Sequence, residues 1–397
     1  MAPGLVLVFA LACGLSAANL YYAQPVLYDI ARSFGTAEST TGLVVTLSQL
    51  GYALGLALLV PLGDILTRKR FLPAVLVVTA AGLVASAAAP SLGVLLAVAL
   101  VVGLGSTVAQ MLVPMAATLA DEATRGRVIG QVMSGLLLGI LLARTVSGLV
   151  AGVTSWRAVY LMAAAVTVGM AVVLGRVVPA EVERPSIRYG ALLGSTVTLF
   201  RTEPLLRRRI LFGALGFAAF SAFWTTMAFV LSGSPYHYGT TTIGLFGLVG
   251  AAGALCATVA GRWADRGLTR TTTLAFAVLV LVSFLPLWLG RVDLAMMLVG
   301  VLALDVGVQG LQVTNQSIIY RLAPDARSRV NSAYMVCYFA GGALGSAAAS
   351  WLYGSHRWAG VCLFGAAIGA AAVVLAGLDV LRRPARPAPA APAPPST

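Results

Sequence analysis

The chain has 397 residues, of which 59 % are hydrophobic and only 10 % are charged, and its formal net charge is +13. A soluble domain carries charge on about a quarter of its positions, so this composition excludes a soluble globular protein. Uncharged runs of about 20 residues recur along the chain, each long enough to cross a hydrocarbon core as a helix. We therefore expect an all-α membrane protein.

Charges, prolines and turn residues separate the apolar segments from one another. Twelve expected spans lie near 4–30, 40–62, 71–89, 92–119, 127–152, 157–177, 210–232, 240–261, 271–289, 294–318, 329–353 and 358–380.

The orientation follows from the basic residues. With a cytoplasmic N-terminus, all 26 Lys and Arg residues lie on the cytoplasmic side except Arg144 in the membrane and Arg32, Arg157, Arg291 and Arg357 outside. The positive-inside rule then places both termini in the cytoplasm. The basic excess is explained by topology and the lipid bilayer, so no nucleic-acid partner is expected. Abundant Arg, Ala and Gly beside a single lysine favour the inner membrane of a bacterium.

The chain contains an internal repeat. "RGRVIGQVM" at 125–133 matches "RSRVNSAYM" at 327–335, and "PLGDILTRKR" matches "GRWADRGLTR" through Asp64 and Asp265. Two halves that both begin inside are related by a pseudo-two-fold axis along the membrane normal. The expected domains are an N-terminal six-helix bundle (1–178), a cytoplasmic linker with a possible amphipathic helix (179–209), a C-terminal six-helix bundle (210–381) and a disordered Pro/Ala-rich cytoplasmic tail (382–397).

At these residues the chain resembles the major facilitator superfamily, because "GDILTRKR" is similar to that superfamily's motif A. "NLYYAQPVL", "GILLARTVSG" and "DVGVQGLQVTNQSIIY" resemble its bacterial drug- and sugar-efflux-like proton antiporter branch. The resemblance implies the major facilitator fold and alternating access, but says little about the cargo. The motif B arginine and glutamine are replaced by Ala99 and Val102, and motif C lacks its proline. The coupling role of the motif B arginine is therefore not carried over.

The resemblance also implies a cytoplasmic gate. Asp64 would dock on the start of span eleven near Arg329 when the inside is closed, and Asp265 on the start of span five near Arg127. Arg68, Arg70 and Arg266 belong to the same loops. The alternative is a short cationic loop that serves topology only.

The strongest site candidate in the second half is Asp305, which is expected near mid-membrane. A buried carboxyl holds its proton more readily than an exposed one, which suits a proton carrier. Gln309, Gln312 and Gln316 follow on the same helical stripe. This stripe indicates a cargo cavity, and interhelical hydrogen bonding is the alternative.

Further cavity candidates lie in spans one and seven. Asn19, Tyr22 and Gln24 are too deep for an interfacial belt, and Asp29 lies one turn further out. Trp224 follows Phe217 and Phe220 at helical spacing, which indicates an aromatic wall for an aromatic or cationic cargo. Aromatic packing against lipid is an equally open interpretation.

Arg144 is an arginine within an apolar span, too far from the outer end to reach water by snorkelling. It needs a carboxylate, carbonyls or a wet cavity, and Asp305 and Asp29 are the acids at comparable depth. Arg144 either holds one of them ionised until a proton competes, or forms a permanent structural bridge. Asp305, Arg144 and Asp29 are thus the proton-coupling candidates.

Glycine rows in spans eight and eleven are expected to be sliding contacts between the halves. They comprise Gly244, Gly247, Gly250 and Gly253, and Gly341, Gly342 and Gly345.

Together these features predict a monomeric secondary transporter that exports a small organic molecule in exchange for protons. It would need no cofactor beyond the proton gradient and no metal. A proton-coupled importer or exchanger of sugars, nucleosides or amino acids is the alternative. A membrane enzyme is a remote one, because His237 and His356 both fall in outer loops.

Overall fold

The computed structural model describes residues 1–179, 189–250, 269–322 and 327–381. The first half contains α1 (Pro3–Ala18), η1 (Gln24–Val26), α2 (Leu27–Phe34), α3 (Glu38–Thr41), α4 (Leu43–Ile65), α5 (Arg68–Ala87), α6 (Leu92–Gly105), α7 (Val108–Leu119), α8 (Arg125–Val153) and α9 (Trp156–Val177). The second half contains α11 (Pro204–Ser232), the helix Thr240–Gly250, α13 (Thr269–Leu289), α14 (Leu294–Leu322) and α15 (Arg327–Leu381), and α10 (Tyr189–Thr202) joins the two halves.

In the described residues, nine helices are long and apolar enough to cross a membrane. The helix α15 contains two of the expected spans, because its helical geometry is broken at Arg357, where φ is 53°. The shorter apolar helices Pro3–Ala18 and Thr240–Gly250 occupy the places of the first and eighth expected spans. The arrangement is therefore consistent with twelve spans.

The helix ends follow from local chemistry. Ser91 and Ser155 precede α6 and α9, and each hydroxyl accepts a hydrogen bond from a first-turn amide. Gly35 ends α2 in the left-handed conformation with φ of 61°, which a glycine adopts without steric cost. In the first span, α1 ends at Ala18, and turns fill the interval before η1. Pro25 lies within η1 and lacks the amide that a continuing helix would need.

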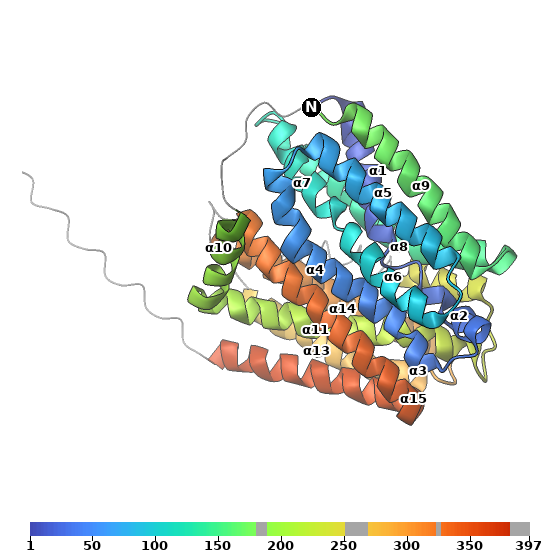
Figure 1. The fold of residues 1–397 in the computed structure, drawn as a ribbon. Helices are drawn as coiled ribbons and strands as arrows, with labels where there is room; N and C mark the ends of the chain where they lie inside the picture. The colour runs from blue at the N-terminus through green and yellow to red at the C-terminus, as the bar shows by residue number, and fades with distance from the viewer. Residues whose placement is uncertain (180–188, 251–268, 323–326, 382–397) are drawn as a thin grey trace, which may run out of the picture.

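The helices form two groups that meet along a seam (Figure 1). In the first half α1 packs on α8, α4 on α6 and α5 on α9; in the second half α11 packs on α15 and α13 on α14. Across the seam α4 contacts α15. The helix α11 lies at the centre of the bundle, and 89 % of its apolar 18-residue stretch is buried.

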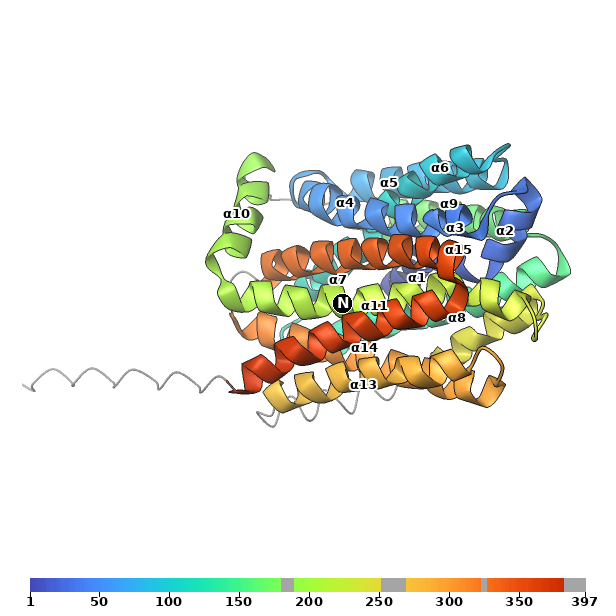
Figure 2. The ribbon, with the colours of Figure 1, turned by 90° about the horizontal axis from the view of Figure 1, so that it is seen from below.

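Two ends of the bundle are named here by their residues. The Asp29 face carries Asp29, Glu38 and Arg357, and the Asp64 face carries Asp64, Arg68 and α10. Figure 2 shows α10 at the Asp64 face, running across the axes of the bundle helices. The helix α10 lies within the range expected for the linker, and its predicted amphipathic character stays a prediction. The next helix, α11, already begins at Pro204, inside the range expected for the linker.

Candidate functional site

Arg144 lies in the second half of α8, with only 2 % of the residue exposed. Its Nε donates a hydrogen bond of 2.6 Å to Oε1 of Gln24. Gln24 is fully buried and begins η1, directly after the turns that interrupt the first span. This break therefore presents a side-chain amide to a guanidinium that cannot reach water.

Aromatic rings surround the same guanidinium. The Cζ atom of Arg144 lies 3.9 Å from the ring centroid of Trp224, 4.8 Å from that of Tyr21 and 5.5 Å from that of Phe220. Stacking of this kind stabilises a desolvated cation by about 2 kcal/mol or more. Tyr21 belongs to the first half of the chain, and Trp224 and Phe220 belong to α11. The aromatic box is thus built across the seam.

Asp305 lies on α14, with 3 % of the residue exposed. A methyl group added at Gly250 would lie 2.9 Å from Cζ2 of Trp224 and 3.3 Å from each carboxylate oxygen of Asp305, which places these groups side by side. Arg144 and Asp305 interact electrostatically. Nη2 of Arg144 and Oδ2 of Asp305 have no hydrogen-bond partner among the described residues. We call Arg144 and Asp305 the buried charge pair.

Backbone contact between the halves continues from the buried charge pair toward the Asp29 face. A methyl group at Gly148 would lie 2.7 Å from the Cα of Gly244, and Thr145 Oγ1 donates to the Gly244 carbonyl at 3.1 Å. Gly247 faces Cβ of Arg144 in the same way, at 2.9 Å. Only glycine allows α8 and the helix Thr240–Gly250 to approach so closely.

The second glycine row has a different partner. Methyl groups at Gly341 and Gly345 would meet backbone atoms of Ala214 and Ala218 on α11. The expectation that this row slides between the halves is therefore wrong for these two glycines, because α15 packs against α11 within its own half. Gly253 lies outside the described residues.

Polar side chains also join the halves at the Asp29 face and within the neighbouring part of the bundle. Thr240 Oγ1 donates to Oδ2 of Asp29 at 2.6 Å, and Arg357 Nη1 lies 3.2 Å from Oε2 of Glu38. Deeper in the bundle, two more hydrogen bonds of 3.0 Å cross the seam, Gln49 Nε2 to Ser221 Oγ and Thr46 Oγ1 to Ser346 Oγ. These contacts close the Asp29 side of the seam apart from a pocket of about 260 Å³, which Asp29, Arg32 and Thr240 help to line. Asp29 itself bonds to Thr240, while the buried charge pair uses Asp305.

The Asp64 side of the seam differs, because a cavity of about 400 Å³ lies there. We call it the inner cavity. It is bounded by α4, α7 and α8 of the first half and by α14 and α15 of the second. Its polar lining includes Gln110, Tyr320, Asn331 and Ser332, and Tyr320 OH donates to Oδ1 of Asn331 at 2.9 Å. The remaining lining residues are apolar, so the inner cavity has a mainly apolar wall with a few uncharged hydrogen-bonding groups.

The polar side chains along one face of α14 lead from the buried charge pair toward the inner cavity. Asp305 is buried, whereas Gln309, Gln312 and Gln316 are each half-buried. Gln312 accepts a hydrogen bond of 2.6 Å from Tyr334 OH, and its Nε2 lies 3.6 Å from the sulfur of Met335, which lines the inner cavity. One helix face thus connects the buried charge pair to the cavity edge.

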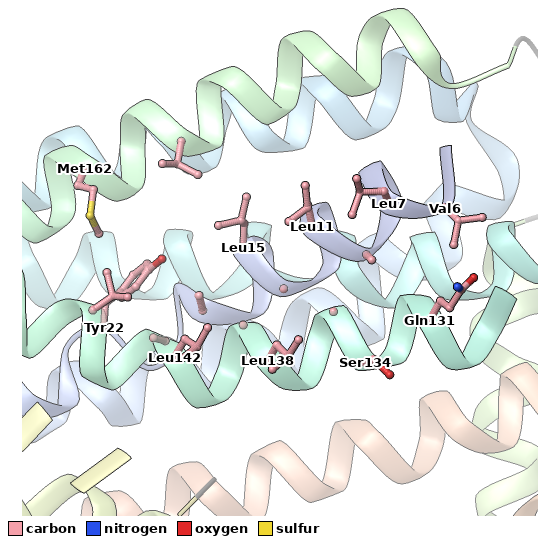
Figure 3. A pocket seen from close by; sticks show the side chains of 18 of the residues that line it. Val6, Leu7, Leu11, Leu15, Tyr22, Gln131, Ser134, Leu138, Leu142 and Met162 are labelled. Carbon is pink, nitrogen blue, oxygen red and sulfur yellow. The ribbon is translucent and has the colours of Figure 1, made fainter. Parts of the chain in front are cut away.

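The candidates of span one separate in the structure. Asn19 and Gln24 are sealed, and Nδ2 of Asn19 and Nε2 of Gln24 have no partner among the described residues. Tyr22 instead borders an apolar groove of about 670 Å³ between α1, α8 and α9. Figure 3 shows Tyr22 at one end of this lateral groove and Gln131 at the other. No single open cavity among the described residues therefore has all of these candidates in its lining: Asn19, Tyr22, Gln24, Trp224 and Asp305.

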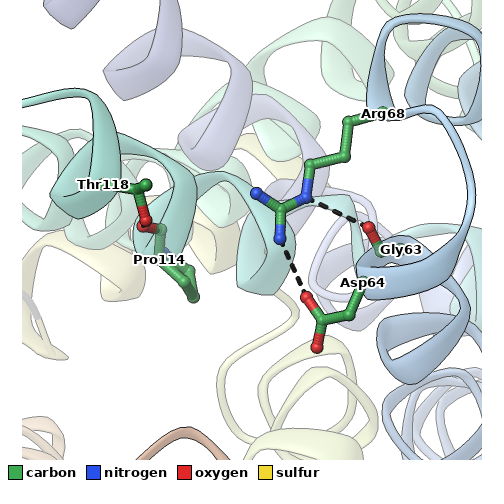
Figure 4. A network of polar contacts seen from close by, with 5 residues as sticks. All are labelled: Gly63, Asp64, Arg68, Pro114 and Thr118. Carbon is green, nitrogen blue, oxygen red and sulfur yellow. Dashed lines mark hydrogen bonds and ion pairs between the residues drawn. The ribbon is translucent and has the colours of Figure 1, made fainter. Parts of the chain in front are cut away.

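The gate residues lie at the Asp64 face. Arg68 Nη2 donates to Oδ1 of Asp64 at 2.8 Å, and Arg68 Nε donates to the Gly63 carbonyl at 3.0 Å (Figure 4). The Asp64 side chain is half-exposed, and Arg70 and Arg329 are exposed. Asp64 is thus paired within its own loop, and its predicted docking on span eleven stays a prediction for the closed inner side. Asp265 and Arg266 lie outside the described residues.

Several residues of the site were not singled out as such from the sequence. Tyr21 forms part of the aromatic box, Gln49 bonds across the seam, and Gln110 and Asn331 line the inner cavity. An amide or phenol within an apolar span was the available signal in each case. Which neighbour it meets depends on helix packing, which no local pattern encodes.

Two helical bundles with charged side chains buried at their seam, closed on one side and hollowed on the other, define a membrane transport protein. The chain belongs to the major facilitator superfamily: the sequence profile of that family matches residues 9–310 and 245–396.

Curated relatives point the same way. The chain is 47 % identical over 370 residues to the putative uncharacterized transporter YgaY of Escherichia coli K12, a match that covers 93 % of each chain. It is 35 % identical over 382 residues to the probable transporter SCO4007 of Streptomyces coelicolor, which covers 95 % of this chain and 87 % of that one.

Solved structures share the fold. A bacterial homolog of the human lysosomal transporter Spinster, in an inward-facing and occupied conformation, superposes with a TM-score of 0.74 at 15 % identity over 94 % of each chain. A structure of the nucleoside transporter NupG gives a TM-score of 0.76 at 13 % identity, over 95 % of this chain and 100 % of that one. At these identities the likeness concerns the fold alone.

Proposed function

We propose that this transporter exports a small organic molecule in exchange for protons by alternating access. The observation that carries the proposal is the buried charge pair. Arg144 comes from the first half, Asp305 from the second, and neither Nη2 of Arg144 nor Oδ2 of Asp305 has a hydrogen-bond partner among the described residues. A purely structural bridge would gain from direct contact, since burying charges is costly unless they are paired and hydrogen-bonded.

The coupling step is proton uptake by Asp305. When Asp305 is ionised, its attraction to Arg144 acts across the seam and favours the closed Asp29 side. Protonation removes that attraction, so the protonation state and the closure of the seam are linked and each biases the other. The half-buried glutamines of α14 provide a polar path from Asp305 to the inner cavity.

Two further features support alternating access. The Asp64 side holds a cavity between the halves while the Asp29 side is closed, as the first of two access states requires. The Spinster homolog of similar fold was solved in an inward-facing conformation. In the orientation given by the positive-inside rule, the Asp64 face is cytoplasmic, the membrane is the bacterial inner membrane, and the present state faces inward.

Proton flux in proteoliposomes tests the proposal. Ethidium, an aromatic cation, serves as the first probe, and a pH-sensitive dye inside the vesicles reports proton movement. We expect ethidium-dependent proton flux that falls in Asp305→Asn by roughly one to two orders of magnitude, the size of a coupling free energy of about 1–3 kcal/mol.

The matched control is Asp293→Asn, because Asp293 is exposed and caps the start of α14 through backbone amides. This variant should keep its flux. Unchanged flux in Asp305→Asn would remove Asp305 from the mechanism. Flux that moves probe and protons in the same direction would favour the importer. A chemically altered probe would indicate an enzyme.

A further inference from the structure

A second cavity lies beneath α10, and we call it the α10 cavity. Its volume is about 350 Å³. Its walls come from α4 of the first half, from α15 of the second and from α10 itself. The lining is largely apolar and includes Leu58, Pro61, Leu193, Val197, Phe200 and Val336.

The helix α10 spans the seam rather than packing into it. It contacts α4, α11 and α15, and Tyr189 OH donates to the Leu58 carbonyl at 2.9 Å. Figures 1 and 2 both show α10 beside the ends of α4 and α15 at the Asp64 face. The α10 cavity is therefore roofed by a helix that touches both halves.

The rest of the protein does not fully cover the apolar side chains of α10. No residue of α10 is buried, and Val197 and Phe200 remain 50 % and 40 % exposed. Apolar area left in water costs about 25 cal/mol per Å², so this side must face lipid or an apolar ligand. In the proposed orientation α10 lies at the cytoplasmic membrane surface, where the cavity would open to the lipid of the adjacent leaflet.

The α10 cavity adjoins the inner cavity. Leu56 and Ser332 line both, so these two side chains form the wall between them. Leu56 comes from α4 and Ser332 from α15, which means that the wall lies at the seam. A small movement of α4 relative to α15 would join the two cavities into one path.

The two cavities have complementary chemistry. The lining of the α10 cavity is almost wholly apolar, while the inner cavity adds the uncharged hydrogen-bonding groups of Gln110, Tyr320 and Asn331 to a mainly apolar wall. Each volume falls within the range of about 300–1,000 Å³ that is usual for small-molecule sites. The lateral groove of Figure 3 is larger, but it lies away from the seam and does not share a wall with the inner cavity.

We propose that the α10 cavity is a lateral access port for amphiphilic cargo from the adjacent leaflet. The apolar chain of the cargo lies under α10, and its polar head passes Leu56 and Ser332 to hydrogen-bond in the inner cavity. This inference rests on the proposed transport function and names its substrate class, a single-chain amphiphile with an uncharged hydrogen-bonding head.

Photolabelling tests the port without requiring transport. The probe is a dodecyl glucoside with a diazirine at the end of its chain, and a butyl glucoside with the same diazirine is its short-chain match. We expect the dodecyl probe to label peptides containing Leu193, Val197 or Val336, and the butyl probe to leave them unlabelled.

The matched variants are Val197→Trp, which fills the cavity, and Thr198→Trp, which places the same ring on the exposed side of α10. We expect labelling to fall roughly ten-fold in Val197→Trp, equivalent to about 1.4 kcal/mol of binding, and to persist in Thr198→Trp. Size-exclusion profiles and thermal unfolding in detergent establish that both variants are folded.

Equal labelling by both probes, or undiminished labelling in folded Val197→Trp, would overturn the port. Displacement of the probe by phosphatidylglycerol as readily as by unlabelled dodecyl glucoside would identify a resident-lipid site and overturn it too. The proposed function fails separately, if the wild type shows coupled proton flux with neither ethidium nor unlabelled dodecyl glucoside. Normal ethidium flux without α10 labelling would reject only the port.

Discussion

The two sides of the seam are built differently. On the Asp29 side, glycine backbones of α8 and the helix Thr240–Gly250 touch, and hydrogen bonds cross between the halves. On the Asp64 side, the halves enclose a cavity, and Asp64 pairs with Arg68 of its own loop. The Asp29 side is held by small residues and a few polar contacts, which can be broken and remade. A transporter needs this asymmetry to be reversible.

The largest effect is expected at the buried charge pair, where the closed side begins. Arg144→Met leaves Asp305 without its counter-charge, and removing one partner of a buried pair destabilises a protein by about 3–5 kcal/mol. Thermal and denaturant unfolding in detergent measures the loss. The control is Arg157→Met: Arg157 also stacks on an indole, 4.2 Å from the centroid of Trp156, but it is only half-buried.

A double variant shows whether the loss is truly electrostatic. Arg144→Met combined with Asp305→Asn should recover most of the stability, because the uncompensated charge is gone. Additive losses would mean that Arg144 acts through the aromatic box and Gln24 rather than through Asp305.

The next largest effect is expected where the glycine backbones meet. In Gly148→Val the added side chain would collide with the Gly244 backbone, and overpacking costs about 1–3 kcal/mol. The Asp29 side should therefore open, and spin labels at Ala37 and Ala295 in a cysteine-free background should move apart.

Gly169→Val is the matched control for this substitution, because a methyl group there meets nothing within 4 Å. An unchanged label distance in Gly148→Val would show that the α8 contact does not decide which side is closed.

A smaller effect is expected at the hydrogen bond between Thr240 and Asp29. Thr240→Val removes the donor while keeping the shape, and a hydrogen bond of this kind contributes about 1 kcal/mol. The ratio of closed to open populations on the Asp29 side should fall by several-fold in the same label experiment. Thr154→Val is the control, because the hydrogen bond of Thr154 Oγ1 among the described residues stays within its own half, to the Val150 carbonyl. Equal shifts in both variants would contradict a specific role for Thr240.

The sequence sufficed for the fold because hydrophobic length, charge asymmetry and the internal repeat are local signals. It also showed that Arg144 required buried partners. The surroundings of Arg144 were harder to predict: Gln24 and an aromatic box make the direct contacts, while Asp305 interacts with Arg144 electrostatically. Partners in space depend on how two helices rotate against each other, which periodicity within one helix does not fix.

The first span shows why the helical pattern failed locally. An unbroken helix would place Tyr22 near Asn19 on one stripe. In the structure the helix stops at Ala18, and turns fill the interval before η1. Tyr21 therefore meets Arg144, while Tyr22 points to the lateral groove. Pro25 indicated a bend, but its extent depends on the packing around it.

The smallest effect is expected at the ion pair between Arg357 and Glu38. The pair spans the halves at 3.2 Å, but its side chains are 75 % and 27 % exposed, and such pairs contribute about 0–1 kcal/mol. Arg357→Gln should therefore shift the spin-label distance distribution less than Thr240→Val does, and added salt should erase the difference from wild type. A larger shift for Arg357→Gln than for Thr240→Val would reverse the comparison. Surface charge would then hold the Asp29 side closed, and the buried contacts would only follow it.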